Sequence, residues 1–239
     1  MRGSVLVWDN SSGEAFFQWC SDDRVVARVE RYERRRFLTD FPPVLEQIVA
    51  TTPVDADTVV YFGAGPGSFT ALKTGAAMLG GLLYARGVTR VRLISSLDIL
   101  SLRTTVPCGA PCVALIPYRG DEVFLSVAVE SGTGKRCYPI HPRAVPFAEL
   151  DAILDRFAGM GGVVIAGGDL PVAVERSLSA RSGTLTRRYP SPELSVERLD
   201  GVPRLGTVEI GSEPLMLRYM VAPADLPAGD REEYYVASN

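Results

Sequence analysis

A glycine-rich turn between a buried strand and a helix constrains the fold of this chain more than any other feature. The apolar run Thr58–Phe62 predicts a strand buried on both faces, and a helix is predicted over 68–85. Between them lie Gly63, Gly65 and Gly67, whose alternate spacing allows positive φ angles and close approach of other backbone segments. A strand, a tight turn and a helix in this order are typical of an α/β fold.

Hydrophobic patterning predicts two α/β halves. Three short strands joined by hairpin-length turns are expected in the first thirty residues, followed by a helix near 37–50. Further strands are predicted at 91–94, 113–116, 122–129, 136–140 and 163–166, and further helices at 95–102 and 147–157. Two prolines and a glycine in Thr104–Pro111 mark the expected boundary between the halves, whereas 190–211 is weakly patterned.

The composition excludes several kinds of protein. The chain has 239 residues, of which 46% are hydrophobic and 22% charged, as in ordinary globular proteins rather than disordered or fibrous ones. Its net charge of −3 argues against a surface that binds nucleic acid throughout. The sequence shows neither an apolar run of the roughly 18 residues that a membrane span needs nor a signal-peptide pattern. We therefore expect a cytoplasmic protein.

Few residues are suited to catalysis or to binding a metal ion. A metal site built from several histidines is excluded because His141 is the one histidine of the chain. The four cysteines include one close pair, Cys108 and Cys112, whereas a zinc site usually needs two such pairs. We expect reduced structural cysteines, and we predict no catalytic residue and no metal ligand.

The turn after the first strand and the glycine-rich turn each supply candidate nucleotide- or anion-binding residues. A helix N-terminus attracts anions because its first N–H groups have no partner within the helix. The P-loop and dinucleotide patterns both fail, since Leu72 replaces a required glycine and Thr70 stands where the dinucleotide pattern ends in glycine. The alternatives are an ordinary hairpin turn after the first strand and a sharp glycine-rich turn without a ligand. The candidate residues are Asp9, Ser11, Ser12, Gly65, Gly67 and Ser68.

The helix predicted over 68–85 contains Gly75, Gly80 and Gly81. Each glycine in a helix interior costs about 1 kcal/mol relative to alanine, so three of them need a physical reason. Small residues allow another segment to approach the helix closely. That segment is either this chain's own sheet or helix, or a helix of another subunit.

Four motifs resemble the bacterial TsaB (YeaZ) family in order and spacing, and together they cover roughly residues 4 to 220. The first is Gly65–Thr70, within GPGSFTALKTG, and the others are Ile94–Leu97, Arg119–Phe124 and Glu213–Arg218. The sequence departs from the residues usual in the family at Ala64, Ala71, Lys73 and Pro117, and in the turn after the first strand.

The resemblance implies an actin-like ATPase (ASKHA) fold of two lobes, each with a mixed sheet flanked by helices. The expected lobes are 1–105, which carries the GPGSFT turn and the pairing helices, and 106–225, followed by a mobile tail at 226–239. The implied function is that of a non-catalytic activating subunit. Its complex transfers a threonylcarbamoyl group to the adenosine next to the anticodon of tRNA.

The resemblance also implies the partners. The catalytic subunit TsaD would pair with this chain, the ATPase TsaE would join them, and tRNA would be bound through the complex. No cofactor would be required by this chain, with ATP or ADP at the interface of the complex, and the chain could form a homodimer when alone. The pairing surface would use the helices at 37–50 and 68–85, through Phe37, Leu45, Ile48, Gly75, Ala76, Leu79, Gly80 and Leu83.

Two other functions stay open on the sequence. One is an actin-like ATP-dependent phosphotransferase, which Asp9 and the glycine-rich turns would favour. The other is a homodimeric scaffold unrelated to tRNA modification, which would use the same glycine-rich helix on a second copy. A metallopeptidase is disfavoured, because the chain does not supply a pair of histidines.

Overall fold

The computed structural model describes residues 4–12, 14–21, 24–31 and 37–210, which form two compact units. Unit 1 contains the described residues up to Ser96 together with the strand that begins at Arg204, and unit 2 contains Leu97–Pro203. Within residues 37–210, the chain therefore enters unit 2 once and leaves it once. The expected tail at 226–239 and the motif Glu213–Arg218 lie outside the described residues.

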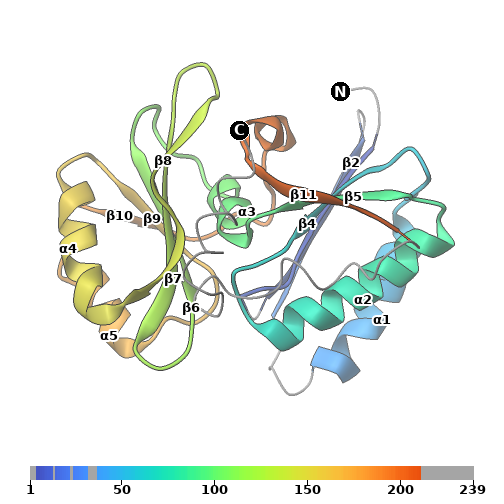
Figure 1. Cartoon of the computed structure of the whole chain (residues 1–239), viewed down its shortest axis with the longest axis horizontal. Coiled ribbons are helices and arrows are strands. Elements are labelled where there is room, and N and C mark those ends of the chain that lie inside the picture. Colours follow the sequence, from blue (N-terminus) through green and yellow to red (C-terminus); the bar gives the residue numbers. More distant parts are fainter. Residues whose placement is uncertain (1–3, 13, 22–23, 32–36, 211–239) are drawn as a thin grey trace. The chain divides into compact units, whose positions relative to one another are not determined.

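Unit 1 is built on a six-stranded mixed sheet with the strand order β11-β5-β4-β1-β2-β3 (Figure 1). The strands are β1 (Val5–Asp9), β2 (Glu14–Ser21), β3 (Arg24–Arg31), β4 (Val59–Gly63), β5 (Arg90–Ile94) and β11 (Arg204–Glu209). β1, β4 and β5 are parallel to one another, whereas β2, β3 and β11 run antiparallel to the strands they pair with. The carboxyl ends of the three parallel strands therefore lie at one edge of the sheet.

The helices α1 (Phe37–Thr51) and α2 (Phe69–Ala85) cover one face of this sheet (Figure 1). Leu6 and Trp8 of β1 face these helices and are fully buried in the shared core. The Trp8 ring packs edge-on against Phe41 of α1, with ring centroids 5.5 Å apart. Val5 and Val7 alternate with Leu6 and Trp8 along β1 and are also buried, which explains the continuous apolar sequence of the strand.

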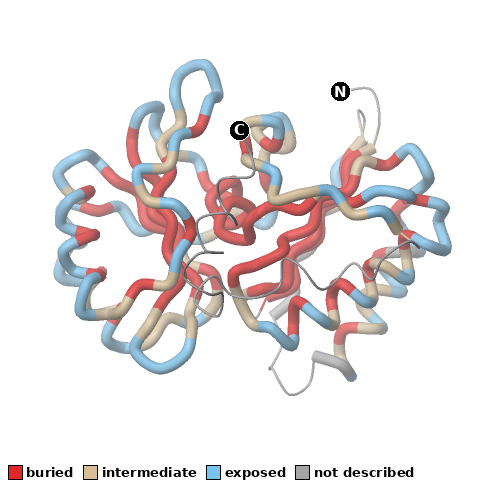
Figure 2. Tube along the Cα trace, viewed as in Figure 1, coloured by how far each residue is buried: buried red, intermediate tan, exposed pale blue. Residues whose placement is uncertain are grey.

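Unit 2 is built on a five-stranded mixed sheet with the strand order β10-β9-β6-β7-β8. The strands are β6 (Pro111–Pro117), β7 (Glu122–Glu130), β8 (Arg136–Pro146), β9 (Val163–Ala166) and β10 (Thr186–Arg188). β6, β9 and β10 are parallel, and β7 and β8 extend the sheet as an antiparallel pair. Figure 2 shows that the central strands of both sheets are buried along most of their length.

The helices α4 (Phe147–Ala158) and α5 (Val172–Ser179) pack on the unit 2 sheet through one apolar side each. Leu150, Leu154 and Phe157 of α4 recur at helical spacing and are buried with residues of the sheet. The remaining helical segments of the described chain are α3 (Ser96–Leu102), through which the chain enters unit 2, and the short 3-10 helix η1 (Val196–Gly201), which precedes its exit.

The division between the units differs from the boundary expected near residue 105. The segment Thr104–Pro111 lies inside unit 2, where the N–H of Gly109 donates to the carbonyl of Glu130 at the end of β7. The strand β11 belongs to unit 1 because it pairs with β5, with Arg204 opposite Ile94. A local cluster of prolines and glycines marks a turn, but it does not reveal this long-range strand pairing.

Candidate functional site

The turn that follows β1 is held by a buried carboxylate. The Ser96 hydroxyl donates to Oδ1 of Asp9 at 2.7 Å, and the Ser11 hydroxyl donates to Oδ2 at 3.0 Å. Ser96 Oγ also accepts the N–H of Gly65 at 3.1 Å, and the N–H of Ser96 donates to the carbonyl of Gly65 at 2.7 Å. These hydrogen bonds join the ends of β1, β4 and β5 in one polar cluster within unit 1. Its members Asp9, Ser11 and Ser96 are buried.

Three glycines permit this cluster to form, because a side chain at each would collide with the turn. A Cβ atom on Gly63 would lie 2.3 Å from Oδ1 of Asp9, and one on Gly67 would lie 2.4 Å from Cβ of Ser11. A Cβ on Gly75 would lie 2.2 Å from Nδ2 of Asn10. All three separations are shorter than any real Cβ contact, so glycine is required by close packing at these positions.

Asn10 explains the first of the unusual glycines in α2. Its side-chain amide is fully buried and donates to the carbonyl of Ala71, one turn before Gly75. Gly75 therefore lies against the turn of its own unit. Of the two explanations that the sequence left open for the small residues of this helix, contact with the chain's own structure accounts for Gly75.

The structure brings together five of the six candidate anion-binding residues, and several of their polar groups already form hydrogen bonds within the turn. The N–H of Gly65 donates to Ser96, and the N–H of Ser68 donates to the carbonyl of Ser11 at 2.8 Å. The Ser11 hydroxyl and both oxygens of Asp9 are engaged as described above. Ser12 is half-buried. An anion at this turn would have to displace hydrogen bonds that hold the fold.

The residues expected to form the pairing surface divide between the interior and the exterior of unit 1. Ile48 of α1 and Gly75, Ala76, Leu79 and Leu83 of α2 are buried in the core of the unit itself. Leu45 and Gly80 are half-buried. The side chain of Phe37 lies outside the described residues. The inward side of α2 consequently serves the packing of this chain, and only the opposite side is accessible to a partner.

The outward side of α2 carries residues that the sequence analysis did not assign to the pairing surface. Phe69 and Tyr84 are exposed large side chains, with 57% and 73% of their surface accessible. Between them the exposed positions include Lys73, Ala77 and Gly81, and a Cβ on Gly81 would meet nothing within 4 Å. The signal was present in the sequence, because 69, 73, 77 and 81 recur at intervals of four and Tyr84 follows three positions later.

Comparison with solved structures identifies the fold. An uncharacterized protein with similarity to peptidase YeaZ from Pseudomonas aeruginosa is 19% identical, with a TM-score of 0.54. The alignment covers 83% of this chain and 89% of that one. YeaZ from Pseudomonas aeruginosa is also 19% identical at a TM-score of 0.54, over 77% of this chain and 95% of that one. The chain has the actin-like ATPase fold.

The fold predicted from the motif resemblance is therefore confirmed, with two mixed sheets flanked by helices. No protein-family model matches the sequence. No curated protein matches it either. Within the part of the chain that the structure describes, no helix has the length and apolar character needed to cross a membrane.

Two further motifs occupy turns between elements. Ile94 ends β5 and Ser96 begins α3, so this motif supplies the hydroxyl that binds Asp9. Arg119 and Gly120 form the turn between β6 and β7, where Gly120 has a φ of +62°. Among the described residues, no group of three or more histidine, cysteine or acidic side chains is placed to hold a metal ion.

Proposed function

We propose that this chain is a non-catalytic activating subunit of the complex that transfers threonylcarbamoyl to tRNA, and that it pairs with the catalytic subunit TsaD. The observation that carries the proposal is the outward side of α2. Small residues at Ala77 and Gly81 allow another helix to approach closely, and the exposed rings of Phe69 and Tyr84 can bury apolar surface against it.

The motif resemblance and the fold support this proposal independently of the surface of α2. YeaZ from Pseudomonas aeruginosa shares the fold of this chain, and the GPGSFT turn lies between β4 and α2, at the start of the proposed pairing helix. The turn is tied to β1 and α3 by internal hydrogen bonds, so it presents α2 in a fixed orientation within unit 1. In this proposal the cluster around Asp9 is structural, and the chain needs no nucleotide of its own.

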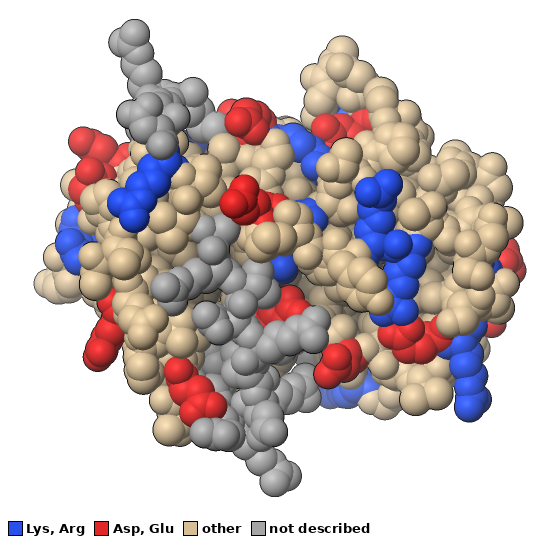
Figure 3. Space-filling model, turned by 180° about the vertical axis from the view of Figure 1, so that it is seen from behind, with Lys and Arg blue, Asp and Glu red and all other residues tan. Residues whose placement is uncertain are grey.

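The surface charge supports a role in which tRNA is held largely by other subunits. Figure 3 shows one face of the molecule, on which basic and acidic side chains of the described residues are interspersed. With a net charge of −3, the chain has no basic excess with which to bind a phosphate backbone. We therefore propose that tRNA, TsaE and any ATP or ADP engage the assembled complex.

The test is a mixing experiment on a sizing column with light scattering, using this chain and the TsaD of the same organism. The expected result is a heterodimer with the unaltered chain and loss of that peak with Gly81→Leu. Leucine is a better helix former than glycine, so this variant should keep its fold. Ala152→Leu, at an exposed position of α4, is the matched control and should pair normally.

The outcomes separate the competing functions. Association of Gly81→Leu with TsaD as strong as that of the unaltered chain would contradict the proposed surface. If the chain forms a dimer alone that Gly81→Leu disrupts, and never pairs with TsaD, the homodimeric scaffold is the better function. Binding of ATP by the isolated chain, measured by calorimetry, would instead favour the phosphotransferase.

A further inference from the structure

The two segments that connect unit 2 to the rest of the chain lie side by side inside unit 2. We call residues 97–104 the incoming connection and residues 191–203 the outgoing connection. Arg103 and Ser191 join them reciprocally: Nε of Arg103 donates to the carbonyl of Ser191 at 2.8 Å, and the N–H of Ser191 donates to the carbonyl of Arg103 at 2.7 Å. Arg103 is buried, and Ser191 is half-buried.

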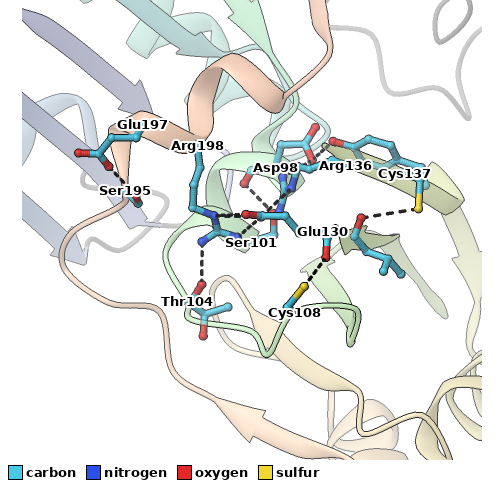
Figure 4. A network of polar contacts seen from close by, with 12 residues as sticks. Asp98, Ser101, Thr104, Cys108, Glu130, Arg136, Cys137, Ser195, Glu197 and Arg198 are labelled. Carbon is cyan, nitrogen blue, oxygen red and sulfur yellow. Dashed lines mark hydrogen bonds and ion pairs between the residues drawn. The ribbon is translucent and has the colours of Figure 1, made fainter. Parts of the chain in front are cut away.

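Arg198 of the outgoing connection forms a second junction (Figure 4). Its Nη1 donates to the carbonyl of Thr104, the last residue of the incoming connection, at 3.2 Å. Its Nε and Nη2 donate to Oε2 of Glu130, at the end of β7, at 3.0 and 2.6 Å. The guanidinium group of Arg198 thus joins the outgoing connection to both the incoming connection and the sheet. Its planar array of donors makes these simultaneous hydrogen bonds possible.

A buried ion pair fixes the helical part of the incoming connection to the sheet. Nη1 of Arg136, the first residue of β8, lies 3.2 Å from Oδ1 of Asp98 in α3, and both side chains are at most 4% exposed. Arg136 also donates to the hydroxyl of Ser101 at 2.7 Å, and the Tyr138 hydroxyl donates to Asp98 at 2.8 Å. Burial raises the pKa of the Asp98 carboxyl, although Arg136 and Tyr138 act in the opposite direction.

Glu130 links the two junctions. Its Oε2 receives the hydrogen bonds of Arg198 and also lies 3.8 Å from Nε of Arg136. Asp98, Glu130, Arg136 and Arg198 therefore form a continuous chain of alternating charges from α3 to η1 (Figure 4). An apolar contact would tolerate sliding of the two connections, whereas bidentate and charge-assisted hydrogen bonds require one register.

We propose that these four charged side chains form a clamp that makes the incoming and outgoing connections one cooperative element of unit 2. The clamp is a conformational device: it prevents either connection from opening while the other stays closed. It does not depend on the pairing proposed above, because it involves no residue of α1 or α2.

Hydrogen exchange followed by mass spectrometry on the full chain tests the clamp, since local opening is read directly from backbone protection. In Arg198→Gln, peptides covering 97–104 and 191–203 should both exchange at least about tenfold faster, while α4 keeps its protection. Arg181→Gln is the matched control. It removes the ion pairs of Arg181 with Asp151 and Asp155 on the exposed side of the same unit, and should leave both connections unchanged.

A milder variant keeps the proposal testable if Arg198→Gln fails to fold. Glu130→Gln removes the charge that both arginines share but retains an acceptor oxygen, and it should again accelerate exchange in both connections. Arg198→Lys should give intermediate protection, because a single ammonium group does not reproduce the planar array of donors. Faster exchange confined to 191–203, with 97–104 unaffected, would overturn the clamp, as would unchanged exchange in both segments.

Discussion

The hydroxyl of Ser96 lies 2.7 Å from the carboxylate of Asp9, although 87 positions separate the two residues in the sequence. This contact joins the end of β1 to the segment that follows β5, at the end of the unit 1 sheet where the three parallel strands terminate. It also explains why a motif at the end of β5 accompanies the glycine-rich turn after β4, since Ser96 binds both Asp9 and the backbone of Gly65.

Replacing Ser96 by alanine should therefore be costly. The substitution leaves the buried carboxylate of Asp9 without one donor and the N–H of Gly65 without its acceptor, and an unsatisfied buried polar group costs about 1–3 kcal/mol. Urea denaturation should show a loss of about 2 kcal/mol for Ser96→Ala. Ser177→Ala removes a hydroxyl that bonds Asp151 on an exposed surface, and should cost about 0.5 kcal/mol or less.

Two glycines of the same helix should respond to alanine with opposite signs. Gly75→Ala places a methyl group on the Asn10 amide and should destabilise the chain by about 1–3 kcal/mol through overpacking. Gly81→Ala meets open space and should stabilise it by about 0.5–1 kcal/mol through helix propensity. Thermal unfolding measures both.

A double variant identifies Asn10 as the cause. The double variant Asn10→Ala/Gly75→Ala should lose less stability than the two single losses added together, because Asn10→Ala removes the side chain with which the new methyl group collides. Strict additivity would mean that the Gly75 effect arises elsewhere in the helix.

The four cysteines should separate into two classes by their reactivity with a thiol reagent at neutral pH. Cys108 and Cys137 are exposed, whereas Cys20 and Cys112 are buried. Burial raises the pKa of the Cys112 thiol to about 11, so very little reactive thiolate forms at that site. Mass spectrometry of the native chain should show two rapid additions, and all four thiols should react after unfolding. Rapid labelling of Cys112 would contradict the packing of β6.

The ion pair between Asp155 and Arg181 should give a stability contribution that depends on pH. A hydrogen bond from Nε of Arg181, 2.7 Å long, holds the pKa of the Asp155 carboxyl below its ordinary value. A lowered carboxyl pKa stabilises the folded chain above the unfolded-state pKa of about 3.9, and the contribution is lost as the pH falls through the folded value. Asp155→Asn should therefore be less stable than the unaltered chain at pH 7, and the difference should shrink as the pH falls below about 3.9.

Local patterns were sufficient to predict most of the elements, including β4, α2 and α4, because each combines a clear hydrophobic period with a turn signal. The sequence did not predict β10, whose three residues are all exposed and show no alternation. It also did not predict β11, because this strand is specified by its pairing with β5 rather than by a pattern of its own.

The candidate site was predicted in part for a similar reason. The sequence grouped Asp9, Ser11 and the glycines only as candidate anion-binding residues, and the structure brings them together because the ends of β1 and β4 meet at one sheet edge. The sequence did not anticipate Ser96 as the donor to Asp9. The sequence analysis also did not distinguish the buried side of α2 from the exposed side. The helical spacing of Phe69, Ala77 and Tyr84 places these residues on one side of the helix, so the distinction could have been made.

The pairing of β11 with β5 makes unit 2 an insertion within the sheet of unit 1, because the described part of unit 2, Leu97–Pro203, lies between these two strands in the sequence. During synthesis on the ribosome, the edge of β5 must stay open until unit 2 has been made. Unit 2 is continuous in the sequence from Leu97 to Pro203, so it can close its core first. Strand β11 is thus synthesised after unit 2 and can join the unit 1 sheet once unit 2 has folded. Cleavage of the chain at one point cannot release unit 1 with its sheet intact, because β5 and β11 lie on opposite sides of unit 2 in the sequence.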